Sequence, residues 1–374
     1  MSAPSTRPYR LYGMAPSYFT RKIQAYFEYK SIPYLFRRFG GAHPAARAAG
    51  WPGGIPVVQT PDGGYMWDTT AMMLYLEDQE PEPSILPTDP VQRFLCFAIE
   101  DVVDEWLYRP AVGSRWFFPR NREHGSWEIA RDVTCETPIP CHQAAEMVAD
   151  YVTASCEAFG VSQDNVQAWI DEVLLPWVRV LNAHFEATPF LFGDRPSLAD
   201  FALFGANAAH FINDPVCRGW LDEHGPAVVQ HTHRLLHPED LELGAWAAPG
   251  DVPDSLIAVL RDMGRLYLPW VTRATVVGEA ELAFTRGDTV TIAASAFLKD
   301  ARAVLLARYE AAKSEELEAV LERAGVGEFF AGHSAEASAV PRYAAPPQPQ
   351  LNRSFAPSAE VEAATFEQVT RDPT

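Results

Sequence analysis

A proline-rich segment, EPEPSILPTDP at residues 80–90, divides the chain into two parts with different hydrophobic patterns. Before it, short apolar runs typical of strands alternate with stretches of helical periodicity. After it, apolar residues recur at helical spacing, beginning with Val91 and Phe94. One hydrophobic core rarely grows past roughly 250–300 residues, so a chain of 374 residues should hold more than one domain. The sequence therefore predicts an α/β domain over 8–80 and an all-helical domain over 90–248.

The first part contains a turn that fixes a hairpin. PDGG stands between IPVVQT and YMW, and a turn of this composition between two apolar runs indicates an antiparallel pair. Upstream, Ile23, Tyr26, Phe27 and Lys30 lie at helical spacing. The predicted order is a strand at 10–13, a helix through 23–30, a strand at 34–39, the hairpin at 55–67 and a helix over 69–77.

The second part reads as helices around one irregular stretch. We expect helices at about 144–158 and 163–187, and we expect residues 115–143 to be irregular and aromatic. SLAD, residues 197–200, matches a capping box, in which Ser197 and Asp200 satisfy each other's backbone amides. The helix behind it is apolar on nearly every side and should be central and buried.

A third region, 250–332, carries a further set of elements. Its alternating pattern predicts a hairpin over 274–293 that turns at RGD, followed by helices at about 293–311 and 314–325. Residues 340–374 are rich in Pro, Ala and Ser and have no periodic apolar face, so we expect a disordered tail.

Composition excludes several classes of partner. A formal charge of −19 and a pI near 4.9 argue against binding nucleic acid or an anionic membrane. The N-terminal residues lack the apolar region of a secretory signal, and no segment has the ~18 uninterrupted apolar residues of a membrane span. Five irregularly spaced cysteines do not form a disulfide framework, although Cys135 and Cys141 could pair. We expect a cytoplasmic protein.

Four motifs in this order resemble the cytosolic glutathione S-transferase-like family. LYGMAPSYFTRKIQAYFEYKSIPY resembles its opening strand and helix, IPVV its cis-proline segment, WDTTAMMLYLE the start of its third helix, and FLFGDRPSLADFALF its buried capping helix. The resemblance covers about residues 8–235. It implies a thioredoxin-like α/β N-terminal domain, an all-α C-terminal domain and glutathione as co-substrate.

The resemblance places Ser17 beside the thiol of glutathione, as the catalytic residue. A free thiol has a pKa of ~8.5, so only about 3% is thiolate at pH 7. Lowering that pKa by ~2 units takes ~2.7 kcal/mol, a plausible contribution from a hydroxyl hydrogen bond and the amides of a helix N-terminus. The alternative is that Ser17 is only a helix N-cap.

Four further residues would hold the tripeptide. The resemblance implies a cis bond before Pro56, which turns the backbone of Ile55 outward to pair with an extended peptide. Asp68 would pair with the α-ammonium, and Thr69 would hold the α-carboxylate at a helix start. Helix capping alone would also explain Thr69.

The chain departs from the family pattern in two ways. Gly54 stands where the family commonly has a Lys for the glycyl carboxylate, and Arg47 or His43 might substitute for it. Asp68 is one methylene shorter than the usual Glu or Gln. Both differences predict weakened glutathione binding. Because the chain has no Cys at position 17 and no CxxC, thiol–disulfide exchange by the protein itself is not expected.

An aromatic segment, DEWLYRPAVGSRWFFPRNR, lies where the family places its hydrophobic substrate cleft. Its candidates for electrophile binding are Trp106, Tyr108, Arg109, Trp116 and Phe117, and Arg109 or Arg115 could hold an anionic group. Packing in the core is the alternative for such aromatic residues.

A histidine cluster does not predict a metal site. His233 and His237 share a helical face, with His224 and His231 nearby, but no carboxylate or cysteine is spaced to complete a tetrahedral set.

Two functions remain open from the sequence. The first is a glutathione-dependent transferase that adds the thiolate to a small hydrophobic electrophile, with lyase, isomerase and dehalogenating variants using the same thiolate. The second is a non-catalytic binding or assembly module of the same fold. The resemblance also implies a homodimer, unless region 250–332 covers the interface, and a role in detoxification.

Overall fold

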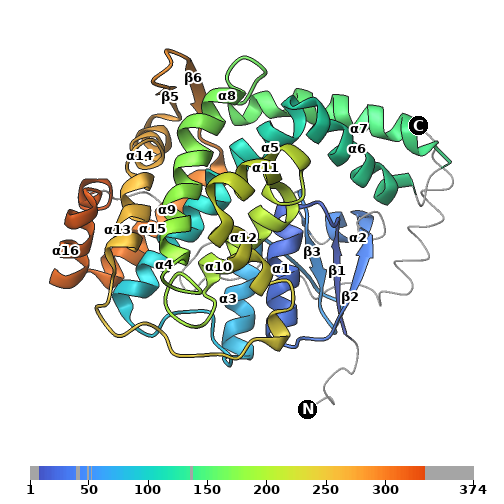
Figure 1. The fold of residues 1–374 in the computed structure, drawn as a ribbon. Coiled ribbons are helices and arrows are strands. Elements are labelled where there is room, and N and C mark those ends of the chain that lie inside the picture. Colours follow the sequence, from blue (N-terminus) through green and yellow to red (C-terminus); the bar gives the residue numbers. More distant parts are fainter. Residues whose placement is uncertain (1–7, 39–42, 49, 52, 135–137, 333–374) are drawn as a thin grey trace.

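The computed structural model describes residues 8–38, 43–48, 50–51, 53–134 and 138–332. Figure 1 shows a small sheet on one side of the molecule and a large helical assembly on the other, with α1 and α3 between them. The expected disordered tail, 340–374, lies outside the described residues. Among the described helices, none has the length and apolar content that crossing a bilayer demands.

The N-terminal domain is a four-stranded mixed sheet with helices on both faces. Strand order is β2-β1-β3-β4; β1 and β2 are parallel, and β3 is antiparallel to both β1 and β4. Its elements are β1 Tyr9–Gly13, α1 Tyr18–Tyr29, β2 Tyr34–Arg38, α2 His43–Ala48, β3 Val57–Gln59, β4 Tyr65–Trp67 and α3 Thr69–Gln79. The predicted strands, hairpin and helix over 69–77 are confirmed, whereas α2 was not expected from the sequence.

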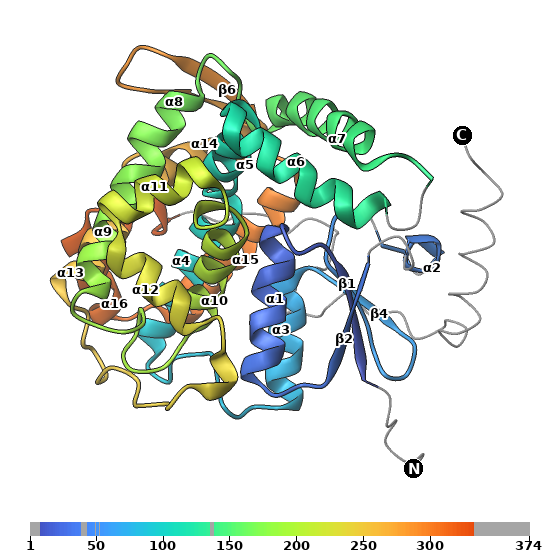
Figure 2. The same ribbon diagram turned by 45° about the vertical axis from the view of Figure 1, so that its right-hand side comes forward.

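Alternation along the strands decides which side chains meet which helices. Leu11 and Val58 face α1 and α3 and join the main core, while Tyr12 and Val57 face the other way and pack with Ala46 of α2. Figure 2 shows α1 and α3 together on one side of the sheet and α2 on the other. This places the first turns of α1 and α3 close to the start of β3, where the hairpin begins.

The helical domain follows as a bundle around α10. Its elements are α4 Pro90–Glu105, α5 Tyr108–Phe117, α6 Pro119–Thr134, α7 Cys141–Ser155, α8 Val166–Ala168, α9 Leu175–Phe185, α10 Leu198–Ala206, α11 Pro215–His224 and α12 Pro226–Arg234. Short turns complete it: 3-10 turns at Cys156–Phe159 and Pro238–Asp240, and π turns at Trp169–Leu174 and Asn207–Phe211. Every residue of α10 is buried, and its predicted capping box is present. α10 packs against both α1 and α4, so it joins the two domains.

Region 250–332 forms a further layer on the helical domain. It consists of α13 Asp254–Met263, α14 Tyr267–Val277, β5 Glu279–Ala283, β6 Thr289–Ala293, α15 Ala296–Ala312, α16 Glu315–Ala324 and a 3-10 turn at Gly327–Phe329. α13 packs on α9 and α15 packs on α4. Tyr267 donates a hydrogen bond to Asp101 Oδ2 at 2.6 Å, which ties α14 to α4.

Two predictions from the sequence are wrong. Residues 115–143 are mostly helical, because the polar helix α6 is held by its packing along α7 rather than by an apolar face of its own. The hairpin is shorter than expected, since residues 274–277 complete α14 and the strands begin at Glu279 after Gly278, whose φ is +98°. Its turn at RGD, together with α15 and α16, is as predicted.

Candidate active site

A pocket of about 150 Å³ lies where the two domains meet. It is lined by Phe19, Gly53, Gly54, Ile55, Pro56, Trp67, Asp68 and Thr69 from the N-terminal domain, by Asp104 and Glu105 from α4, and by Phe297 from α15. The structure thus brings together all four residues expected from the sequence to hold the tripeptide. It adds three residues from two distant segments that the sequence did not indicate.

The loop before β3 shapes one wall of this pocket. The Ile55–Pro56 peptide bond is cis, as the resemblance implied. Gly53 and Gly54 both have positive φ, +131° and +85°, a region that favours glycine over any residue with a Cβ. A Lys at position 54 would therefore be strained, which gives a physical reason for its absence.

Arg47 is a cation that lies beside this loop. A Cβ added to Gly53 would lie 4.0 Å from Nη2 of Arg47, and the guanidinium stacks on Trp51 with 4.7 Å to the ring centroid. His43 belongs to α2. Arg47 does not line the pocket itself, but it is positioned beside the loop that does.

Asp68 and Thr69 form the start of α3. Asp68 has φ +74°, which is uncommon for a residue with a side chain, and its Oδ1 accepts a hydrogen bond from Ala71 N at 3.4 Å. Thr69 is the first residue of α3 and is buried. Both residues therefore belong to the helix start, and both also face the pocket.

Ser17 is the N-cap of α1. Its Oγ accepts from Thr20 N at 3.4 Å, and its side chain is half-buried. Ser17 is not among the lining residues, although Phe19 in the same helical turn is. A hydroxyl that accepts one hydrogen bond still has its own O–H to donate, so capping and donation to a ligand are compatible.

Arg115 fixes the loop that carries Ser17. This buried guanidinium is paired with Asp214 at 2.9 Å and donates from Nη1 to Pro16 O at 2.8 Å. A Cβ at Gly13 would lie 2.5 Å from Thr20 Oγ1, so the close approach of β1 to α1 also requires glycine. The sequence suggested Arg115 as a site for an anionic group, whereas here it positions the main chain from behind.

Tyr18 is engaged elsewhere. Its hydroxyl donates to Val103 O at 2.6 Å, its ring packs edge-on against Tyr108, and it is buried. Burial raises the pKa of Tyr18 well above its usual value, and Asp104 adds to the effect. Tyr18 is thus a tie between α1 and α4.

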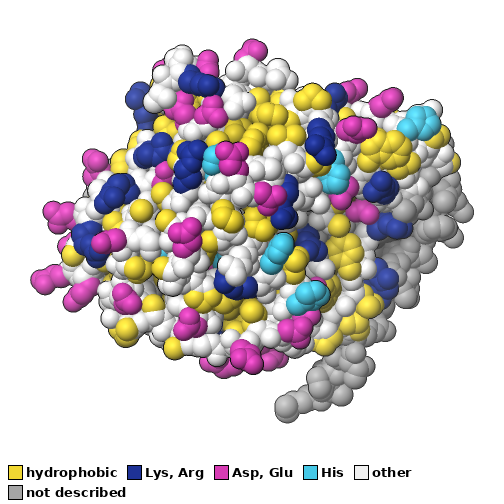
Figure 3. All heavy atoms as spheres, viewed as in Figure 1, with side chains coloured by type: hydrophobic (Ala, Val, Ile, Leu, Met, Phe, Trp, Pro, Cys, Tyr) yellow, Lys and Arg dark blue, Asp and Glu magenta, His cyan; other side chains and the backbone are white. Residues whose placement is uncertain are grey.

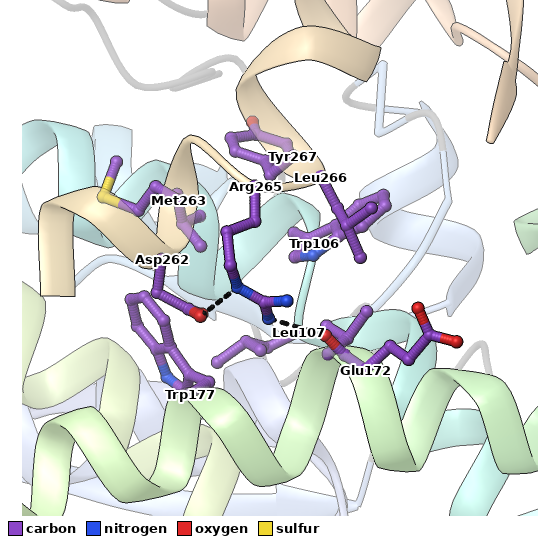
Figure 4. A pocket seen from close by; sticks show the side chains of 11 residues that line it. Trp106, Leu107, Glu172, Trp177, Asp262, Met263, Arg265, Leu266 and Tyr267 are labelled. Atoms are coloured by element: carbon purple, nitrogen blue, oxygen red, sulfur yellow. Dashed lines mark hydrogen bonds and ion pairs between the residues drawn. The ribbon is translucent and has the colours of Figure 1, made fainter. Parts of the chain in front are cut away.

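The five candidates for electrophile binding are not gathered in one place. Trp106 and Arg109 are buried beneath α14, where the guanidinium stacks on Trp106 at 5.4 Å and on Trp270 at 4.7 Å. Figure 4 shows Trp106 beside a small hollow of about 10 Å³, where Arg265 donates to Asp262. Packing in the core, the alternative weighed above, describes these two residues.

The other three lie elsewhere. Tyr108 stacks on Phe19 with 5.8 Å between ring centroids, so it supports the pocket from behind. Trp116 and Phe117 border a separate open groove of about 920 Å³ between α6 and α7. Tyr108 therefore contacts the pocket residue Phe19, and Arg109 donates to the main-chain oxygen of the pocket residue Glu105.

The histidine cluster does not converge. His231 bonds Asp200 Oδ1 at 2.8 Å and stacks on Phe185, whereas the side chain of His237 is 77% exposed. In the part of the chain that the structure describes, no three His, Cys, Asp or Glu residues are grouped as a metal would require.

Figure 3 shows acidic and basic side chains interspersed on one face of the molecule.

Comparison with known proteins agrees with this architecture. The family model of the glutathione S-transferase N-terminal domain matches residues 11–84, and that of the glutathione S-transferase C-terminal domain matches residues 172–239. The first match contains Ser17, Ile55, Pro56, Asp68 and Thr69. A maleylacetoacetate isomerase from Pseudomonas aeruginosa is 27% identical over 199 residues, which are 52% of this chain and 76% of that protein.

Two solved structures are similar to this chain at low sequence identity. A glutathione S-transferase from Methylobacterium radiotolerans, in complex with glutathione sulfonate, is 17% identical with a TM-score of 0.40, covering 66% of this chain and all of that one. A glutathione transferase from Phanerochaete chrysosporium is 16% identical with a TM-score of 0.44, covering 63% of this chain and 99% of that one. The two domain matches, with the thioredoxin-like sheet followed by a helical domain, support a glutathione S-transferase-like family for this chain.

Proposed function

We propose that the protein is a glutathione-dependent transferase that adds the glutathione thiolate to a small hydrophobic electrophile. The observation that supports this best is the convergence of Ile55, Pro56, Asp68 and Thr69 on one pocket beside the first turn of α1. Each of these residues offers a group that a γ-glutamyl tripeptide needs, and they come from two segments that the fold brings together.

The proposed binding mode assigns one ligand group to each residue. The main chain of Ile55 pairs with the cysteinyl backbone, as an added strand does. Thr69 and the α3 N-terminus hold the α-carboxylate, and Asp68 pairs with the α-ammonium. Arg47 meets the glycyl carboxylate from beside the glycine loop.

The proposed chemistry is deprotonation and positioning. Ser17 donates its hydroxyl hydrogen to the sulfur while it caps α1, and the amides of the helix start add a favourable field. Arg115 holds Pro16, and with it the direction of the Ser17 hydroxyl. The apolar rings of Phe19, Trp67 and Phe297 exclude water beside the thiolate.

An isomerase is the second candidate. The relative from Pseudomonas aeruginosa is a maleylacetoacetate isomerase, and a glutathione thiolate can serve isomerisation as well as transfer. Turnover separates the two functions. Conversion of maleylacetoacetate with only catalytic glutathione would indicate the isomerase, whereas consumption of one glutathione per electrophile would indicate the transferase.

Binding comes before either reaction. Calorimetric titration should give a glutathione dissociation constant between micromolar and millimolar, because the usual Lys is absent. The titration uses about 10 mM glutathione, which exceeds the weakest expected dissociation constant of ~1 mM. No heat and no thermal shift at that concentration would favour the non-catalytic module.

The assembly and location are also proposals. We propose a homodimer in the cytoplasm, in keeping with the family resemblance and the absence of a disulfide framework. Sedimentation velocity tests the homodimer, since a dimer has twice the 41.5 kDa mass of the chain.

A further inference from the structure

The candidate pocket is acidic. Asp68, Asp104 and Glu105 all line it, and none of the described residues that line it is a Lys or an Arg. Carboxylates that share a small space repel one another, and each loses hydration on burial. Carboxyls grouped this way favour a cation in contact with them.

Asp104 is only half satisfied by its partner. Lys22 Nζ lies 2.5 Å from Asp104 Oδ2 but also 2.6 Å from Glu100 Oε1, so one ammonium is shared between two carboxylates. The side chain of Asp104 is 11% exposed, and its Oδ1 is a buried atom without a hydrogen-bond partner among the described residues. This oxygen belongs to a side chain that lines the pocket.

Glu105 is a second carboxyl at the same wall, and its surroundings favour its neutral form until a cation lies beside it. Burial raises the pKa of its carboxyl well above the ordinary value; Asp101 and Asp104 raise it further, Arg109 opposes them, and Asp68 adds to the rise. The Arg109 guanidinium stacks on Trp106 and Trp270 and donates to the main-chain oxygen of Glu105.

Aromatic rings complete the wall around these carboxylates. Phe19, Trp67 and Phe297 come from three separate segments and line the same pocket. Ring faces attract organic cations, and attract them more strongly where water is excluded. Carboxylates and rings together are complementary to an organic ammonium.

Charge balance decides which ligand carries the cation. In the proposed function, the single α-ammonium of glutathione is taken by Asp68, and its α-carboxylate brings a compensating negative charge. Asp104 and Glu105 are then left without a cation from glutathione. We propose that the second substrate carries an ammonium group and that Asp104 and Glu105 bind it. This proposal rests on the proposed function for the identity of the first substrate, but not for the cation site itself.

The site is tested first without glutathione. Three probes of one shape, benzylammonium, benzyl alcohol and benzoate, are titrated into the full chain at neutral pH by calorimetry. We expect benzylammonium to bind at least about tenfold more tightly than benzyl alcohol, and benzoate not to bind. Equal affinity for benzylammonium and benzyl alcohol would overturn the proposal.

Glu105→Gln then locates the cation. This variant keeps the shape of the side chain and leaves the Lys22–Asp104 pair intact, so it is better suited than a change at Asp104. Benzylammonium affinity should fall at least about fivefold, with the affinity of benzyl alcohol as the reference. Glu80→Gln, at the exposed far end of α3, is the matched control and should bind like the wild type. Unchanged benzylammonium binding by Glu105→Gln would contradict the assignment.

Turnover separates this inference from the proposed function. Aryl halides that differ only in an aminomethyl, methyl or carboxylate substituent are compared by kcat/KM with glutathione. The order aminomethyl, then methyl, then carboxylate supports both proposals, and the reverse order overturns the ammonium substrate alone. No conjugation of any aryl halide, together with selective benzylammonium binding, would reject the transferase and keep the cation site.

Discussion

Lys22 Nζ lies 2.5 Å from Asp104 Oδ2 and thereby joins α1 to α4 directly behind the candidate pocket. The lysine is fully buried and also contacts Glu100 Oε1 and Thr70 Oγ1. Its neighbouring carboxylates hold the pKa of Lys22 above the ordinary value despite the opposing effect of burial. One ion cluster therefore connects both domains to the acidic wall.

Lys22→Met should destabilise the protein strongly. The change leaves Glu100 and Asp104 buried without their shared cation, and removing one member of a buried pair costs about 3–5 kcal/mol. Urea unfolding measures the loss. Arg218→Met, which breaks the exposed pair with Asp222, is the control and should cost no more than about 1 kcal/mol. Similar losses in the two variants would mean that the buried cluster contributes little.

Arg47→Ala should weaken glutathione binding by about tenfold, because the glycyl carboxylate loses its proposed cation. The glycyl ethyl ester of glutathione, which has no charge there, should bind both proteins alike. Arg37→Ala on the exposed strand β2 serves as the control. Equal losses for glutathione and its ester would argue against a charge contact at Arg47.

Much of the N-terminal domain was predictable because its signals are local. PDGG fixes the hairpin, and the approach of β3 to α3 follows from the hairpin, whereas the family resemblance supplied Ile55, Pro56, Asp68 and Thr69 as a group. Their proximity depends on short connections within a single sheet.

The rest of the site was not predictable for a physical reason. Asp104, Glu105 and Phe297 reach the pocket through packing of α4 and α15, and nothing local to those helices marks the direction that a side chain faces. Trp106 and Arg109 are the opposite case. Their segment was expected to line a substrate cleft, but α14 covers both side chains.

Phe297→Ala should raise KM for a hydrophobic electrophile roughly five- to tenfold, since the ring supplies apolar surface to the pocket. Glutathione binding should change little. Phe329→Ala, in the same C-terminal layer but outside the pocket, is the comparison. A loss of glutathione affinity equal to the rise in KM would place Phe297 against glutathione instead.

His210→Gln should change how stability depends on pH. Burial lowers the pKa of His210 well below its usual value, and Arg115 lowers it further, so the folded state keeps the ring neutral while the unfolded chain protonates below about 6.5. The wild type therefore binds fewer protons folded than unfolded and loses stability as pH falls through that range.

The measured quantity is the unfolding free energy of the variant minus that of the wild type. Buried carboxyls with raised pKa values, such as Asp101, contribute equally to both proteins and cancel in this difference. The unfolding free energy of the variant relative to the wild type should rise by up to about 1.4 kcal/mol for each pH unit below ~6.5 and stay flat above ~7.5. A difference that does not change with pH would mean that His210 titrates normally in the folded protein.

The central claim is that Ser17 donates to the sulfur of bound glutathione, and thiolate absorbance of the complex against pH tests it most directly. Wild type and Ser17→Ala are titrated with saturating glutathione, and their melting temperatures are measured alongside. Ser314→Ala removes another N-cap, one that accepts from Leu317 N at 3.2 Å far from α1, and controls for the loss of a cap alone. We predict that the wild type and Ser314→Ala ionise the thiol below its free pKa of ~8.5, and that Ser17→Ala shifts the curve upward. Coincident curves for all three proteins, with only the melting temperatures lowered, would contradict the account and leave Ser17 as a cap.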